Sequence, residues 1–288
     1  MRVGLIDVDG HNFPNLALMK LSRYYKNKND IVELNGIGDY DIIYKSKVFT
    51  FTNNDNGLYS SLRIIEGGTG YKNYNTLSDD IEHIEPDYDL YKTKYAYGFL
   101  TRGCIRKCSW CIVPQKEGTL RANADISEFI GNKKSAILLD NNVLASDWGL
   151  AQIEKIISLK IKIDFNQGLD SRIIANNSDI AKLLSRVKWL KPIRMACDTK
   201  SQMNDIEKAT SLLRQYGATP KRYFIYVLVK DISAALERVE FLRRLNLDPF
   251  AQPYRDFSNN KIDYEAKRFA RWVNRKAIFK TIPWNEYK

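Results

Sequence analysis

The 288-residue chain has few of the residues that stabilise small secreted proteins. Four cysteines are too few for a disulfide scaffold in a chain of this length, and such a set suits a reduced cytoplasm. No apolar run approaches the ~18–20 residues that a membrane-spanning helix needs. The N-terminus turns acidic after six residues and lacks the apolar core of a secretion signal. We therefore expect a cytoplasmic protein without a membrane partner.

The composition is that of an ordinary globular protein, with 44% hydrophobic, 12% aromatic and 27% charged residues. Lys and Arg number 45 against 34 Asp and Glu, which gives a formal net charge of +11. This positive charge indicates a polyanionic partner such as nucleic acid, or another anionic substrate that carries phosphate. The alternative is a basic surface without such a partner, since a pI near 9.3 is common among soluble proteins.

Residues 1–70 predict a small Rossmann-like α/β domain. Its expected elements are strands at Val3–Val8, Ile31–Leu34 and Ile42–Tyr44, a helix that contains Leu16, Met19 and Leu21 with Pro14 in its first turn, and a glycine-rich turn at Glu66–Gly70. Residues 71–94, rich in Asn, Asp and Tyr, show no clear period and indicate a linker.

A regular alternation of strands and helices begins at Tyr95. Short apolar runs predict six strands, at Tyr97–Leu100, Ala136–Leu139, Ile161–Phe165, Ile193–Ala196, Tyr223–Val229 and Pro249–Gln252. Helical stretches follow: Asp147 to Leu159 with Asp147 as cap, a helix capped by Ser178 or Asp179 that runs to Val187, then Met203–Tyr216, Ser233–Leu245 and Tyr264–Ala277. This α/β pattern predicts a partial (β/α)6 TIM-like barrel over residues 95–260, then a basic helical extension over 261–288.

Three cysteines fall within eight residues, directly after the first of these strands: Cys104, Cys108 and Cys111. On one loop they bring three thiolates together, and thiolates are soft donors that suit zinc or an iron–sulfur cluster. Structural zinc normally needs a fourth Cys or His nearby. None is adjacent, because the two histidines are His11 and His83. Three ligands on a four-iron cluster leave one iron open to bind a small molecule. Buried or zinc-bound cysteines remain the alternative.

The CxxxCxxC spacing, with Trp110 before the last cysteine, resembles the fingerprint of the radical SAM family. Thr101-Arg102-Gly103 is similar to the entry to this loop in the methylthiotransferase-like and cobalamin-associated branches, and the resemblance covers about Tyr95 to Gln252. It implies that Cys104, Cys108 and Cys111 ligate a [4Fe–4S] cluster that binds S-adenosylmethionine. It further implies reductive cleavage to a 5′-deoxyadenosyl radical acting on an unknown substrate, and an electron donor such as flavodoxin or ferredoxin.

The resemblance directs attention to polar residues after the next three strands. Where the family has a GGE-like segment, this chain has Leu139-Asp140-Asn141-Asn142. Candidate residues for binding the nucleoside cofactor are Asp140, Asn142, Gln167, Arg172 and Asp198. Gln167 and Arg172 have an equally weighted alternative, a turn with a helix cap. Cys197, next to Asp198, is expected to pack in the core.

The first 70 residues resemble a shortened form of the Rossmann-like domain that precedes the barrel in cobalamin-dependent radical SAM proteins. Gly67-Gly68-Thr69 is similar to the glycine turn of that domain, and Asp9-Gly10-His11 to its Asp-x-His motif. Pro14 stands where the family has glycine, so we expect His11 to cap the helix and do not expect bound cobalamin. A cobalamin-dependent methyltransferase remains an alternative.

Basic residues concentrate in two segments. Residues 92–121 hold seven against Glu117 alone, and residues 261–288 interleave Arg271, Trp272, Arg275 and Phe279. Such interleaving is found in nucleic-acid grooves, but a helix with a basic solvent face looks the same. The alternative from a different class is therefore a zinc-stabilised nucleic-acid-binding protein.

Overall fold

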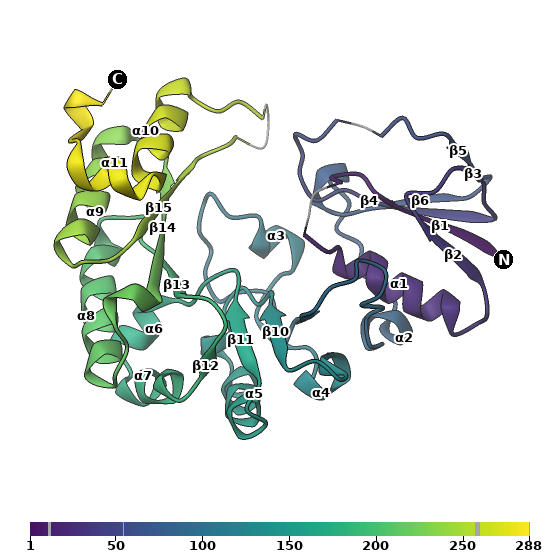
Figure 1. Cartoon of the computed structure of the whole chain (residues 1–288), viewed down its shortest axis with the longest axis horizontal. Helices are drawn as coiled ribbons and strands as arrows, with labels where there is room; N and C mark the ends of the chain where they lie inside the picture. The colour runs from purple at the N-terminus through teal and green to yellow at the C-terminus, as the bar shows by residue number, and fades with distance from the viewer. Residues whose placement is uncertain (11–12, 54, 257–259, 288) are drawn as a thin grey trace.

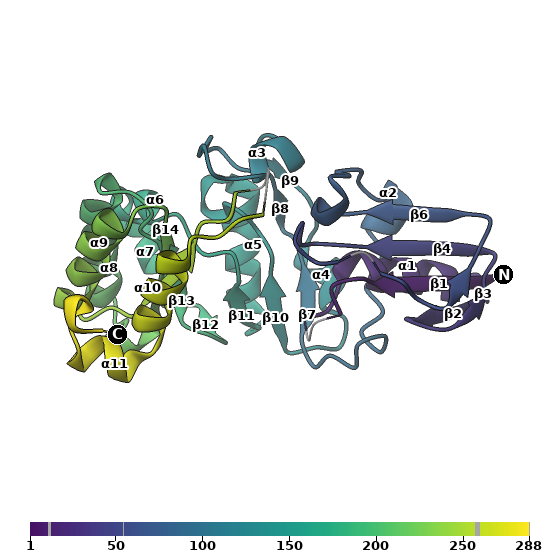
Figure 2. The ribbon, with the colours of Figure 1, turned by 90° about the horizontal axis from the view of Figure 1, so that it is seen from above.

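The computed structural model describes residues 1–10, 13–53, 55–256 and 260–287. The fold is mixed α/β with parallel sheets (Figure 1). Viewed from above, the N-terminal sheet lies at one end of the molecule, the C-terminal helices lie at the other, and further strands lie between them (Figure 2). Within the described ranges, no helix is long and apolar enough to cross a membrane.

The N-terminal unit is a parallel sheet with one main helix, α1 (Leu16–Lys26). Its strand order is β2-β1-β4-β6, with β1 at Arg2–Asp7, β2 at Ile31–Leu34, β4 at Ile42–Ser46 and β6 at Ile64–Gly67, and a short pair formed by β3 (Gly38–Asp39) and β5 (Tyr59–Ser60) lies beside it. The expected strands are confirmed. The placement of Pro14 inside the helix is wrong, because Asn15 is the cap and its side chain accepts from the Leu18 amide.

Residues 71–94 pack against α1. The 3-10 turn η1 (Thr69–Tyr71) leads into this segment, which contains helix α2 (Asp79–Glu82). The buried Lys20 ammonium of α1 lies 3.1 Å from a Glu82 carboxylate oxygen, and Ser22 donates to buried Asp87 at 2.7 Å. This segment is therefore anchored along its length.

Six longer parallel strands follow, and each falls within two residues of its expected position. One sheet has the order β12-β11-β10-β7, with β7 at Ala96–Gly98, β10 at Ser135–Leu138, β11 at Lys162–Phe165 and the short β12 at Lys188–Trp189. The other has the order β13-β14-β15, at Ile193–Ala196, Tyr223–Val229 and Pro249–Pro253. A parallel bridge between Leu169 and Met195 connects the end of β11 to β13.

Helices α4 to α9 connect these strands, and α10 and α11 follow β15. Their bounds are α4 Ile126–Ile130, η2 Val143–Ala145, α5 Asp147–Ser158, α6 Ser171–Ala175, α7 Ser178–Ser185, α8 Ser201–Gln215, η3 Pro220–Arg222, α9 Ile232–Arg244, α10 Tyr264–Asn274, α11 Lys276–Thr281 and η4 Trp284–Glu286. Two expected caps are wrong: Ser146 caps α5 and Asn177 caps α7, because those residues have the extended backbone of a cap. The expected helix 264–277 breaks at Arg275.

The C-terminal helices close one end of the main hydrophobic core. The Trp272 and Phe279 rings are buried there, whereas Arg271 and Arg275 are exposed. These rings are therefore unable to stack on bases, so the interpretation of the 271–279 stretch as a nucleic-acid groove is wrong. The stretch is a pair of helices with a basic solvent face.

Candidate functional site

The three cysteines lie on one loop at the carboxyl end of β7. Two short strands, β8 (Thr101–Arg102) and β9 (Arg121–Ala122), pair antiparallel and enclose this loop together with helix α3 (Val113–Lys116). Figure 1 shows α3 at the end of the sheet toward which the arrowheads of β10 and β11 point. The carboxyl ends of parallel strands are where such folds build their active sites.

Gly103 gives the loop its sharp entry. Its φ is +80°, and a Cβ there would fall within 3.0 Å of the Thr119 carbonyl oxygen, so only glycine fits. The Gly103 amide donates to the Glu117 carboxylate at 3.0 Å, and Asn141 donates to the same oxygen at 2.9 Å. The one acid of this basic segment therefore fixes the base of the loop.

The thiols occupy a half-buried, polar setting. Cys104 and Cys108 are half-buried, and Cys111 is exposed. The Cys104 sulfur accepts from the Arg106 amide at 3.3 Å and from Asn142 Nδ2 at 3.4 Å. Within the described part of the chain, no three His, Cys, Asp or Glu side chains converge closely enough, as they stand, to hold a metal ion.

Charges near the thiols act on their ionisation. Burial raises the pKa of Cys108, and the nearby Arg172 guanidinium opposes that effect. Burial also raises the pKa of Cys111, while the Val113 amide lowers it and the neighbouring thiolates raise it again. The cysteines are thus near enough to interact electrostatically, which agrees with their position on one tight loop.

Asp170 connects the cysteine loop to the helix after β11. This carboxylate accepts from Arg172 at 2.7 and 3.0 Å, from Arg106 Nε at 2.9 Å and from Asn142 Nδ2 at 3.3 Å. Burial alone would raise the pKa of Asp170, but the hydrogen bonds from Arg172 and Arg106 hold it below its usual value. We call Asp170, Arg106, Arg172 and Asn142 the Asp170 cluster.

Asp140 binds backbone amides at the start of the cysteine loop. Its buried carboxylate accepts from the Thr101 amide at 2.6 Å, the Thr101 hydroxyl at 2.7 Å and the Leu100 amide at 3.3 Å. Burial raises its pKa to about 6, although these donors oppose the shift. The structure therefore places Asp140 under the start of the cysteine loop, with both oxygens engaged.

The remaining two predicted residues have different positions. Gln167 is exposed in the turn after β11. Asp198 is half-buried after β13, where its Oδ1 accepts from the Leu228 amide at 2.9 Å. Burial raises its pKa, and the Leu228 amide and Arg238 oppose that shift. Its charge acts on both Cys108 and Cys111, so it lies on the same side of the molecule as the thiols.

Several buried polar atoms in this region have no hydrogen-bond partner within the described residues. They are Asn142 Oδ1, Asp164 Oδ1 and Ser171 Oγ. Asp164 also forms a buried ion pair with Arg194 at 3.1 Å. Because unpaired buried polar atoms are costly, such atoms at one end of a sheet are a typical sign of a ligand site.

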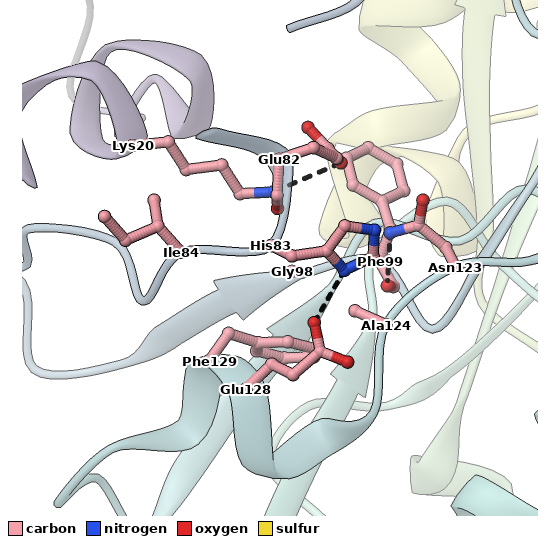
Figure 3. Close-up of a pocket in the computed structure, with 10 residues that line it drawn as sticks. All are labelled: Lys20, Glu82, His83, Ile84, Gly98, Phe99, Asn123, Ala124, Glu128 and Phe129. Carbon is pink, nitrogen blue, oxygen red and sulfur yellow. Dashed lines mark hydrogen bonds and ion pairs between the residues drawn. The ribbon is translucent and has the colours of Figure 1, made fainter. Parts of the chain in front are cut away.

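Figure 3 shows a separate pocket between α1, α2 and the β7–α4 region. His83 Nδ1 lies 2.7 Å from a Glu128 oxygen, and Lys20 pairs with Glu82. The free space is about 10 Å³, which is room for about one water molecule. The pocket therefore lies where the N-terminal unit contacts the rest of the chain, and it is too small for a substrate.

The N-terminal glycine turn is filled by the chain itself. A Cβ on Gly68 or Gly70 would fall within 3.0 Å of Lys47, and the Asp9 carboxylate accepts from the amides of Val48 and Phe49 at 2.5 and 3.2 Å. Lys47 therefore packs directly against the backbone of this turn. His11, expected to cap the helix, lies outside the described residues.

Two residues of this region, Asp170 and Arg106, were not predicted from the sequence as part of a site. The polar run 166–172 after the third strand was a visible signal for Asp170, whereas nothing in the sequence pairs it with Arg106.

A scan against protein-family models and a search of curated proteins find no match to this chain.

Proposed function

We propose that this chain is a radical SAM enzyme that acts on an anionic substrate, built on a partial (β/α)6 barrel. The observation that carries the proposal is the position of three thiols on one loop at the carboxyl end of β7, next to the Asp170 cluster. The strand order supports the barrel, because the Leu169–Met195 bridge joins the two sheets into one row of six strands with β12 as the first part of β13.

The donor set suits the cofactor. Cys104, Cys108 and Cys111 would hold three irons of a [4Fe–4S] cluster, and thiolates are the ordinary ligands of such clusters. When bound, the cluster supplies the electron that splits S-adenosylmethionine into methionine and a 5′-deoxyadenosyl radical. The β8–β9 pair closes the loop that carries all three thiols, which supports their binding to one cluster.

The surrounding residues divide into binding and positioning roles. Asn142 and Ser171 offer unpartnered polar atoms for the amino group or the ribose hydroxyls of the nucleoside. Asp198 is a half-buried carboxylate on the same side as the thiols. Asp140 and Asp170 act as positioning groups, because Asp140 holds the Thr101 amide at the start of the cysteine loop and Asp170 holds Arg106 between the first two cysteines.

The basic charge of residues 92–121 suits the electron donor. Seven cations against one acid near the cluster favour its reduction and attract an anionic protein such as flavodoxin or ferredoxin. Such donors belong to the cytoplasm, where we place the enzyme.

The test is an anaerobic assay with dithionite and S-adenosylmethionine, with 5′-deoxyadenosine measured by chromatography. The wild-type protein should form 5′-deoxyadenosine, and the triple variant Cys104→Ala/Cys108→Ala/Cys111→Ala should form none. Cys197→Ala is the matched control, since this cysteine is buried in the core and should leave the activity intact. Full activity in the triple variant would refute the proposal.

A further inference from the structure

Aromatic rings and cations alternate across the surface beside the cysteine loop. Lys230, exposed after β14, has its Nζ 5.5 Å from the centroid of the Trp110 ring and 4.4 Å from that of Tyr254. Arg255, next in the chain, stacks its guanidinium 3.7 Å from the centroid of the Phe51 ring. These contacts connect the cysteine loop, the ends of β14 and β15, and the N-terminal unit.

The N-terminal unit supplies the far end of this surface. Phe51 stacks on Phe49 with ring centroids 5.1 Å apart, and the two side chains remain 47% and 39% exposed. Asp9 holds their loop through its bonds to backbone amides and to Thr52 Oγ1 at 2.7 Å. We call these residues the aromatic strip: Trp110, Lys230, Tyr254, Arg255, Phe51 and Phe49.

The end of the strip that contains Phe49 and Phe51 is held to the segment after β15. Thr50 Oγ1 lies 2.6 Å from Asn260 Oδ1, and Asn260 Nδ2 donates to the Thr50 carbonyl oxygen at 3.1 Å. Figure 1 shows the loop after β4 facing the segment after β15. Because the chain fixes exposed rings in this position, the rings are prepared to receive a ligand without a large ordering cost.

Two acids near this surface, Asp9 and Asp231, keep their negative charge and are engaged by backbone amides of the chain. The carboxylate of Asp9 is engaged by the 48–52 loop, and that of Asp231 caps α9 by accepting from the Ala234 amide at 2.7 Å. Residues 99–121, which follow β7 and include Trp110, hold five Lys and Arg against Glu117, a net charge of +4. A ligand that complements the strip therefore carries both negative charge and flat apolar faces.

We propose that the aromatic strip binds single-stranded nucleic acid and delivers one of its nucleotides to the cysteine loop. Phosphates would pair with Lys230 and Arg255 and draw these cations off the rings that they contact, and bases would stack on the ring faces that this exposes. A duplex hides its base faces, and an acidic protein has few flat rings in register with its charges. The inference rests on the proposed function, because it names the substrate class of that enzyme.

The test is fluorescence anisotropy of the full-length protein with a labelled single-stranded RNA of about 12 nucleotides, the range that single-strand grooves cover. Phe51→Ala should weaken binding about ten-fold, since one lost base stack has roughly that effect. Phe51→Tyr keeps a ring and should bind as the wild type does, whereas Phe51→Leu keeps the apolar volume and should bind as Phe51→Ala does.

Lys230→Ala should weaken binding several-fold and reduce the slope of log affinity against log salt by about 0.7, the contribution of one phosphate contact on a single strand. Lys182→Ala is the matched control, because it removes one exposed cation from α7, outside the strip. An equal loss in this control would overturn the proposal.

A duplex of the same sequence should bind more weakly, and polyglutamate should compete poorly. Equal binding of the duplex, equal competition by polyglutamate, or equal affinity of Phe51→Leu and Phe51→Tyr would overturn the inference. These measurements need no cluster or reductant. If 5′-deoxyadenosine forms but the RNA does not bind, this inference fails and the proposed function stands. If the RNA binds but no 5′-deoxyadenosine forms, the proposed function fails and the strip remains a binding site for single-stranded RNA.

Discussion

Two carboxylates at the ends of parallel strands, Asp9 and Asp170, hold loops in different ways. Asp9, after β1, accepts from two backbone amides and a threonine of its own unit. Asp170, after β11, accepts from Arg172 in the helix that it caps, and also from Arg106 and Asn142, side chains of two distant loops. The first arrangement closes a turn, whereas the second gathers charged and polar groups around thiols. A strand-end acid is thus a sign of a site when its donors are side chains from distant segments.

Gly103, in the cysteine loop, and Gly68, in the N-terminal unit, allow the same comparison, and their substitution should have the largest effect on stability. Gly103→Ala places a Cβ against the Thr119 carbonyl at a φ of +80°, and we expect a loss of about 4 kcal/mol in stability from strain and overlap together. Iron binding should be lost as well. Gly68→Ala has a comparable overlap with Lys47 in the N-terminal unit and should destabilise the protein but leave iron binding intact. Thermal unfolding and iron content measure the two effects; iron loss in both variants would remove the distinction.

A pH dependence isolates Asp140. Its pKa in the folded protein, about 6, lies above the ordinary value of 3.8, so the folded state binds more protons than the unfolded state between these values. The contribution of Asp140 to stability is therefore present below pH 4 and is lost as the pH rises to about 6. The stability of the wild type relative to Asp140→Asn should fall by about 3 kcal/mol over this range. Urea unfolding at pH 4, 5, 6 and 7 tests this, and a flat difference would contradict it.

The two carboxylates can be compared by the same substitution. Asp170→Asn leaves Arg106 and Arg172 without their carboxylate, and we expect a loss of about 2 kcal/mol together with weaker retention of iron. Asp9→Asn should cost a similar amount of stability with no change in iron content. Urea unfolding and iron analysis of both variants check this, and equal iron content would show that Asp170 has no role at the thiols.

The smallest effect is expected at the fourth cysteine. Cys197 is fully buried, and burial raises its pKa to about 12, so its thiol stays protonated in the core. Cys197→Ala should cost about 1 kcal/mol for the small cavity that it leaves. Thermal unfolding measures that cost. Loss of the cluster in this variant would mean that Cys197 is a ligand after all.

The positions of the six longer strands along the chain were predictable, and the details at their ends were not. The runs at Tyr223–Val229 and Ile161–Phe165 are apolar enough to identify buried strands without further information. The caps were misplaced by one residue, because Ser146 and Asp147 are both good caps and the sequence does not show which has an extended backbone.

The candidate site was predictable only where its residues are close in sequence. The spacing of Cys104, Cys108 and Cys111 shows one loop, whereas the contact of Arg106 with Asp170 depends on how two distant loops pack. The burial of Trp272 likewise depends on the partners of its helix, since interleaved aromatic and basic residues look alike in a groove and in a core.

The most direct test is the metal and sulfide content of protein purified and reconstituted without oxygen. The wild type should hold about four irons and four sulfides per chain and absorb near roughly 400 nm, and the triple cysteine variant should hold neither. Zinc without sulfide in the wild type, or unchanged iron in the triple variant, would contradict the account.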